Sequence, residues 1–256
     1  MKQIIKRGSF FTLMFMLLGC LSLYAADNDL ITRQITIELE KAGTLPNRIT
    51  SSKKYKITNL KIIGEINGTD LQMIREMAGR DYMGYFTDGK LSVLDLSEAK
   101  IVKGGDWYYS DLHTSNDVIG SYAFKGCNRL TSLTLPAGIN EIGSSAFNGC
   151  SRLTSIYLNA EKVPEIGSNV FEGCDAKKCT LYVPMGTRDD YWLSSFGDYF
   201  ENIVEFDVTG IDKTTTSTDV EEVARYSVNG QRLSAPTKGL NIVKYSDGSV
   251  KKVAVR

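Results

Sequence analysis

The sequence predicts an α/β solenoid, that is, a stack of short parallel strands capped at both ends, followed by a small C-terminal β-hairpin module. The first observation is a phrase that recurs in residues 119–135, 142–158 and 166–174, with starts 23 and 24 residues apart. Between the first two copies, 13 of the first 23 positions are identical. Self-similarity at such a period is typical of repeat proteins. The second observation is apolar alternation inside each copy, and the third is a pair of turn sequences near the C-terminus.

Each of the first two copies contains the spacing Leu-x-x-Leu/Ile-x-Leu, which is the signature of a leucine-rich repeat. In a strand at this position, Leu133 and Leu135 point inward while Ser132 and Thr134 point outward. One such strand cannot bury its apolar face alone, so successive copies stack and their aligned residues form ladders. We expect Gly126 and its equivalents to turn the chain with positive φ. The predicted ladders are Phe124, Phe147 and Phe171; Ala123, Ala146 and Val170; and Ile119, Ile142 and Ile166.

The repeated phrase Ile-Gly-x-x-Ala-Phe-x-x-Cys-x-x-Leu-x-x-Ile-x-Leu-Pro resembles the BspA-type leucine-rich repeat of surface proteins from Bacteroides-like bacteria. The resemblance covers about residues 57–206. It implies a secreted or surface-attached binding protein, and some members of the family are adhesins for host matrix proteins. It implies no catalytic residue and no cofactor.

The N-terminus has the pattern of an export signal. Residues 1–25 combine a basic start, an apolar stretch over 10–23 and a small-residue end at Ala25, which predicts a cleaved signal peptide. The apolar stretch is shorter than the ~20 residues of a membrane span, so we expect no span in the mature chain. We therefore expect a secreted protein or one on the outer cell surface. Lipidation at Cys20, in Leu17-Leu-Gly-Cys20, is the alternative.

Beyond the signal peptide the chain divides into four parts. These are 27–90, an N-terminal cap with a divergent first repeat; 91–206, the leucine-rich repeats and C-terminal cap; 207–219, a linker; and 220–256, a small β-rich module. In the N-terminal cap, the pattern predicts a strand over 35–39, a helical turn within 42–49 and a helix over 70–78. Thr69 and Gln72 have the spacing of a capping box for that helix.

The C-terminal part contains an aromatic cap and two hairpin signals. The last predicted strand of the repeats lies in 178–183, and the aromatic residues over 191–206 are expected to seal the end of the stack. The turn sequences Asn229-Gly230 and Asp247-Gly248 each predict a β-hairpin. This tail is similar to short endings that serve as secretion-sorting signals in some relatives, and a plain accessory β-module is the alternative.

The cysteines of the repeats are expected to be free thiols. Cys127, Cys150 and Cys174 occupy one repeat position, and parallel side chains on neighbouring strands are poorly placed for a disulfide. A bond between Cys174 and Cys179 stays open. Metal binding is weakly indicated, because His113 is the sole histidine and the cysteine spacings are repeat spacings.

Nothing in the sequence indicates catalysis. It contains no Gly-x-Ser-x-Gly, P-loop or His-Glu-x-x-His motif, so we expect a protein that is not an enzyme and needs no cofactor. Thirty basic residues balance thirty acidic ones, which gives no indication of a nucleic-acid partner. The expected partner is a host or bacterial surface protein or glycan. The alternative is a structural spacer or coat component with no specific ligand.

The outward positions of the strands form the predicted binding face. Tyr157 and Tyr182 would lie side by side on neighbouring strands, and tyrosine is enriched at interface hot spots. The alternative, equally consistent with the sequence, is that these tyrosines are there because aromatic side chains suit strands. The excursion over 104–116 is the competing site, since Trp107 and Tyr108 could contact a carbohydrate or a protein. The preferred interpretation of these two rings is that they fill the gap between divergent and regular repeats. The flanking candidates on the strands are Thr134, Ser155, Thr180 and Asp95.

Overall fold

The computed structural model describes residues 30–207, 222–227, 231–245 and 250–255, which fall into two compact units, Met1–Val208 and Thr209–Arg256. Each unit is considered by itself. The predicted signal peptide with Cys20, all of the predicted linker after Asp207, and the turns Asn229-Gly230 and Asp247-Gly248 lie outside the described residues.

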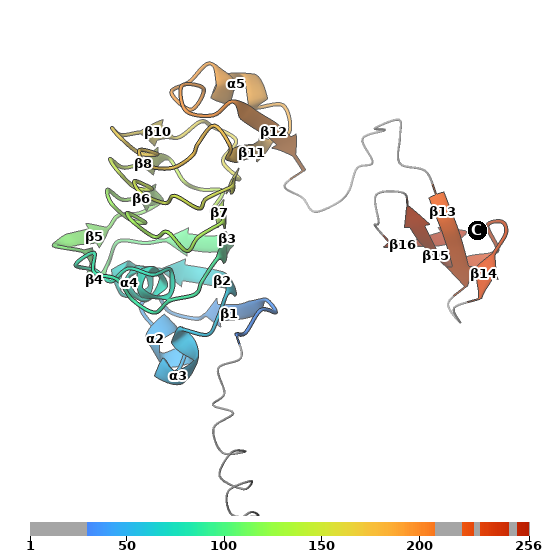
Figure 1. Cartoon of the computed structure of the whole chain (residues 1–256), viewed down its shortest axis with the longest axis horizontal. Helices are drawn as coiled ribbons and strands as arrows, with labels where there is room; N and C mark the ends of the chain where they lie inside the picture. Colours follow the sequence, from blue (N-terminus) through green and yellow to red (C-terminus); the bar gives the residue numbers. More distant parts are fainter. Residues whose placement is uncertain (1–29, 208–221, 228–230, 246–249, 256) are drawn as a thin grey trace, which may run out of the picture. The chain divides into compact units, whose positions relative to one another are not determined.

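The first unit is built on a seven-stranded sheet whose strands follow one another in chain order, each pair of neighbours parallel. A second, narrower parallel sheet runs along the opposite side of the repeats (Figure 1). This order fits a solenoid-like stack. The wide sheet contains β1 (Ile35–Leu39), β2 (Asn59–Ile66), β3 (Val93–Ile101), β7 (Ser132–Leu135), β9 (Ser155–Leu158), β11 (Thr180–Pro184) and β12 (Asn202–Phe206), and the narrow sheet contains β6 (Val118–Ile119), β8 (Glu141–Ile142) and β10 (Glu165–Ile166).

The predicted ladders are present in the core between the two sheets. The rings of Phe124 and Phe147 lie 5.6 Å apart and those of Phe147 and Phe171 lie 5.5 Å apart, with 8° between the ring planes in both pairs. All three rings are buried, as are the inward leucines Leu133 and Leu135. Strand phase is therefore as the apolar alternation predicted.

Glycine at the turn of each copy is required by the backbone. Gly126, Gly149 and Gly173 have φ of +71°, +74° and +74°, which other residues rarely adopt. A Cβ atom at Gly173 would also lie 3.3 Å from the backbone of Gly149. Substitution there is disfavoured both by conformation and by space.

In the turns that carry the ladder phenylalanines, the backbone hydrogen bonds between successive copies run in one direction. In the first copy, Phe124 N donates to Ala146 O (2.7 Å) and Gly126 N donates to Asn148 O (2.7 Å). The second copy repeats the pattern toward the third, where Phe147 N donates to Val170 O at 3.0 Å. Each of these turns therefore offers carbonyls to the copy before it and N–H groups to the copy after it.

The cysteines take part in this stacking as thiols. Cys150 Sγ donates to Phe124 O and Cys174 Sγ donates to Phe147 O, both at 3.0 Å. Cys127, Cys150, Cys174 and Cys179 are all free, as the parallel-ladder argument predicted for the first three. Cys174 and Cys179, whose pairing the sequence left open, form no disulfide. Burial raises the pKa of Cys127 and raises that of Cys179 to about 12, which disfavours the reactive thiolate.

The N-terminal cap contains three helices, α2 (Leu45–Arg48), α3 (Ser51–Lys54) and α4 (Gly68–Met77). The prediction of Thr69 and Gln72 as the capping box of α4 is wrong by two residues. Asn67 caps the helix, since its side chain accepts from Thr69 N (3.1 Å), and Asp70 Oδ2 accepts in return from Asn67 N (2.9 Å). Asp70 also accepts from Leu45 N (2.9 Å) and so ties α2 to α4.

The predicted irregular excursion is instead a β-hairpin, formed by β4 (Gly104–Tyr109) and β5 (Leu112–Thr114). Arg75 of α4 lies fully buried between this hairpin and the first copy, with its guanidinium 4.8 Å from the ring of Tyr109. Its Nη1 donates to Tyr122 O (2.9 Å) and Ala123 O (2.8 Å). The divergent N-terminal part is thereby hydrogen-bonded to the regular repeats.

At the other end, α5 (Arg188–Trp192) and the segment after it seal the stack, as the aromatic composition predicted. Tyr191, Phe196 and Phe200 are buried, and the ring of Phe200 makes a T-shaped contact with Phe171 at 4.8 Å. The prediction that strands end with 178–183 is wrong, because β12 adds one more parallel strand to β11.

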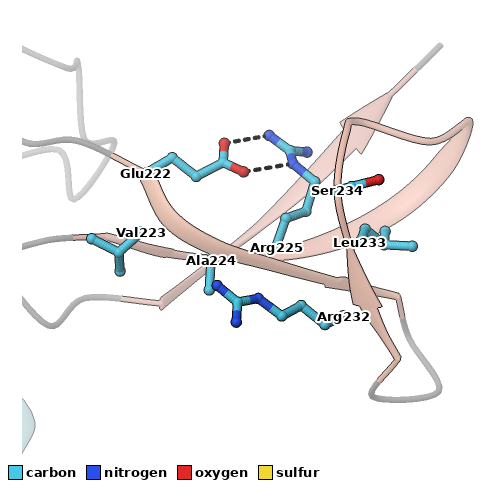
Figure 2. A pocket seen from close by; sticks show the side chains of 7 residues that line it. All are labelled: Glu222, Val223, Ala224, Arg225, Arg232, Leu233 and Ser234. Carbon is cyan, nitrogen blue, oxygen red and sulfur yellow. Dashed lines mark hydrogen bonds and ion pairs between the residues drawn. The ribbon is translucent and has the colours of Figure 1, made fainter.

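The second unit is a four-stranded antiparallel sheet of β13 (Glu222–Ser227), β14 (Arg232–Leu233), β15 (Gly239–Tyr245) and β16 (Val250–Val255), in the order β14-β13-β15-β16. Both predicted hairpins are present, and β13 pairs additionally with β15. Figure 2 shows the Glu222 carboxylate facing the Arg225 guanidinium, with N–O distances of 2.9 and 2.7 Å, beside a cavity of about 540 Å³.

We expect Phe147→Ala to lower the free energy of unfolding by about 3–5 kcal/mol, because it opens a cavity between two stacked rings. Chemical denaturation of the wild type and the variant measures the difference. Phe86→Ala, which removes an exposed ring, is the matched control and should cost less than about 1 kcal/mol. Equal effects of the two substitutions would mean that the ring ladder does not hold the copies together.

Candidate ligand-binding face

The outward face of the seven-stranded sheet is formed by alternate residues of each strand. Strand pairing places one outward row in register across the sheet, with each residue beside its equivalent on the next strand. The row begins with small and charged side chains and becomes aromatic and apolar toward β12. In order it contains Thr36, Lys61, Asp95, Thr134, Tyr157, Tyr182 and Val204.

Tyr157 and Tyr182 form a stacked pair at the centre of the apolar end. Their ring centroids lie 4.3 Å apart with 8° between the planes, and both side chains are half-buried. Two residues before the tyrosines, Thr180 on β11 pairs with Ser155 on β9. These two polar residues of the predicted binding face therefore flank the rings. Thr134 is the neighbour of Tyr157 on β7. The structure therefore brings these five predicted residues together.

Phe206 is a third ring at this site, although its place in the aromatic segment 191–206 predicts a role in the C-terminal cap. Its ring makes T-shaped contacts with Tyr157 (5.5 Å) and Tyr182 (6.5 Å). Val204, two residues earlier on β12, lies beside Tyr182 and is 44% exposed. The signal that could have placed both residues is the alternation in Asn202-Ile-Val-Glu-Phe206, where Ile203 is buried. We call Tyr157, Tyr182, Val204 and Phe206 the aromatic cluster.

The tyrosine pair offers hydroxyl groups and apolar area without charge. Burial, and then the neighbouring Tyr182, raise the pKa of the Tyr157 phenol, so the hydroxyl stays protonated at physiological pH. A protonated phenol both donates and accepts a hydrogen bond. The cluster can thus combine contact area with directional polar contacts.

Asp95 lies at the charged end of the row and is already engaged. Lys61 Nζ is 3.4 Å from Asp95 Oδ2 and 2.7 Å from Glu98 Oε1, and Asp95 Oδ1 accepts from Ser97 N at 2.9 Å. Hydrogen bonding to Glu98 raises the pKa of Lys61. Asp95 belongs to an ion-paired group two strands away from Tyr157, not to the aromatic cluster.

The structure separates Trp107 and Tyr108 from the sheet and from each other. Tyr108 is buried, and its hydroxyl donates to Ser121 O at 2.9 Å, so its prediction as a ligand-contacting residue is wrong. The physical reason is strand alternation: in β4, Tyr108 points to the core and Trp107 to solvent. Trp107 remains accessible on the hairpin.

Residue types that could hold a metal ion do not gather in the described part of the chain, where no group of three or more His, Cys, Asp or Glu has suitable geometry. Each helix among the described residues is too short or too polar to cross a membrane.

Residues 110–227 match the family model of the BspA type Leucine rich repeat region, in six copies. The match spans under half of the 256-residue chain and includes all three copies of the repeated phrase, together with the whole aromatic cluster. It supports the resemblance drawn from the repeated phrase. No curated protein matches the chain.

We expect the buried Tyr108 phenol to make stability depend on alkaline pH. Burial raises its pKa to about 12, whereas an unfolded tyrosine ionises near pH ~10. The stability that the buried, neutral Tyr108 phenol contributes is therefore fully present below pH ~10 and is lost as pH rises through about 12. Unfolding free energies measured from pH 9 upward should fall less steeply for Tyr108→Phe than for the wild type. An unchanged slope would show that this phenol is exposed; Tyr85→Phe, at an exposed tyrosine, is the control.

Proposed function

We propose that this chain is a binding and adhesion module that holds a protein ligand on the outward face of its parallel sheet, without catalysis. The observation that carries the proposal is the aromatic cluster, three rings on a face whose other outward positions are mostly small or polar. Tyrosine at such a position gives contact area at little cost in conformational entropy. The match to the BspA type repeat supports a protein-binding or adhesion role.

A protein ligand fits the cluster better than a sugar does. Because Tyr157 and Tyr182 stack on each other, each covers one ring face of its partner. The opposite faces are flanked in register by Thr134 and Val204. A sugar packs on an open ring face, whereas a protein interface can use ring edges, hydroxyls and the flat apolar area together.

An adhesion role requires export, and the N-terminal sequence supports it. We propose that residues 1–25 are removed as a signal peptide and that the mature protein is secreted or held on the outer cell surface, with lipidation at Cys20 as the alternative route. The C-terminal module is proposed to be an accessory unit that could serve in sorting. Neither assignment alters the geometry of the sheet.

The test measures by interferometry whether residues 27–256 bind to immobilised fibronectin, laminin and collagen. We expect saturable binding to at least one of them. The double substitution Tyr157→Ala with Tyr182→Ala should weaken it at least tenfold, which corresponds to about 1.4 kcal/mol. The melting temperature should fall only modestly, because a half-buried aromatic pair contributes about 0.5–1.5 kcal/mol.

Tyr85→Ala is the matched control, since this tyrosine is 67% exposed and lies outside the sheet. It should leave binding unchanged. Absence of saturable binding to all three proteins would favour a spacer or coat component. Binding that survives the double substitution would place the interface elsewhere.

A further inference from the structure

A cavity of about 380 Å³ opens at the β4–β5 hairpin, apart from the seven-stranded sheet. In Figure 1 the hairpin lies on the side of the repeats that carries β6, β8 and β10. The volume is within the ~300–1,000 Å³ typical of small-molecule sites. The lining residues are Gln72, Tyr82, Gly105, Asp106, Trp107 and His113.

Trp107 gives this cavity an open aromatic surface. The side chain is 50% exposed, although Trp is among the largest apolar residues. Its one ring contact in the described residues is T-shaped, with His113 at 6.2 Å and 70°. Unlike the tyrosines of the sheet, the indole is not stacked against another ring, so a ligand can pack on it.

Several polar groups of the lining have no partner within the described residues. His113 Nδ1 lies 3.0 Å from Gly105 O, and because a carbonyl only accepts, this nitrogen carries the proton. Nε2 makes no hydrogen bond within the described residues. The Gln72 carboxamide, the Tyr82 hydroxyl and the Trp107 indole N–H make no hydrogen bond in the described part of the chain. Donors and acceptors are thus both available around one aromatic surface.

The charge of the lining selects against anions. Asp106 is the acidic residue of the described lining, and its Oδ2 accepts from Thr69 Oγ1 at 2.9 Å. An anionic ligand would meet this carboxylate with no Lys or Arg in the same lining to offset it. Lys54, which lines the neighbouring cavity, is already ion-paired with Glu76.

A second cavity, of about 290 Å³, adjoins the first. Gln72 lines both, and the hydrogen bond between Thr69 and Asp106 joins one residue from each lining. A ligand made of linked units could therefore occupy both cavities, with Gln72 between the units.

We propose that these two cavities bind a neutral oligosaccharide, with one hexopyranose packed on Trp107. The C–H groups on one face of a pyranose are apolar and fit the indole, while the hydroxyls at its rim both donate and accept. Gln72, Tyr82 and His113 supply the matching polar groups. This site is independent of the protein-binding face proposed for the sheet.

The test uses Trp192→Phe in residues 27–256, which leaves Trp107 as the sole tryptophan. Its fluorescence is titrated with maltotriose, cellotriose, mannotriose and tri-N-acetylchitotriose. We expect a saturable change with at least one of them, and at least tenfold weaker binding of the anionic sialyllactose. No change with any neutral trisaccharide up to about 10 mM, where even a Kd of roughly 1 mM would nearly saturate, overturns the proposal.

Calorimetry with the sugar that binds then locates the site. Trp107→Ala should abolish binding, and Gln72→Ala and His113→Ala should each weaken it at least fivefold, with melting temperatures close to the wild type because all three side chains are at least partly exposed. Tyr157→Ala with Tyr182→Ala should leave sugar binding unchanged. Loss on the tyrosine substitutions, or persistence in Trp107→Ala, would contradict the assignment.

Discussion

The turns that carry the ladder phenylalanines are joined by backbone hydrogen bonds that run in one direction along the stack. In the second copy, Ser144, Ala146 and Asn148 offer carbonyls that the first copy satisfies. The equivalent carbonyls of the first copy have no preceding copy, and a buried carbonyl left unpaired costs about 1–3 kcal/mol. Side chains of α4 and of the β4–β5 hairpin take the place of the missing copy. Tyr108 Oη donates to Ser121 O (2.9 Å), Arg75 Nη1 to Ala123 O (2.8 Å), and Arg75 Nη2 to Lys125 O (3.4 Å).

This constraint also sets where the two proposed binding surfaces lie. Because Tyr108 must reach the first copy, strand alternation turns Trp107 outward on the same hairpin, beside Gln72 of α4. On the other side, regular stacking keeps β9 and β11 in register, which brings Tyr157 against Tyr182. One requirement of the fold, that every copy has its backbone groups paired, thus exposes the Trp107 indole on the hairpin and forms a closed aromatic stack on the sheet.

The features that follow from local pattern could be predicted from the sequence, and those that follow from distant contacts could not. Repetition fixed the phenylalanine ladder, the strand phase and the tyrosine pair, since each depends only on the period. The hairpin at 104–114 and the burial of Tyr108 depend on carbonyls that are unpaired only because the stack begins there. Arg75 follows Ile74 in an amphipathic helix, where a cation is ordinarily solvated, so the sequence gives no sign of its burial. The outward position of Phe206 could not be predicted, because aromatic composition alone does not separate a residue that seals the stack from an outward residue on an added strand.

The most direct test of this account is the free energy of unfolding of Arg75→Met, with Arg33→Met at an exposed site as the control. Methionine fills similar space but cannot donate to the carbonyls of Tyr122, Ala123 and Lys125. Since hydrogen bonds from charged groups contribute about 1.5–3 kcal/mol each, we predict a loss of about 3 kcal/mol or more for Arg75→Met and little change for the control. If the free energy of unfolding of Arg75→Met lies within about 1 kcal/mol of the wild-type value, the carbonyls of the first copy do not need side-chain donors. That result would contradict the role given to Arg75.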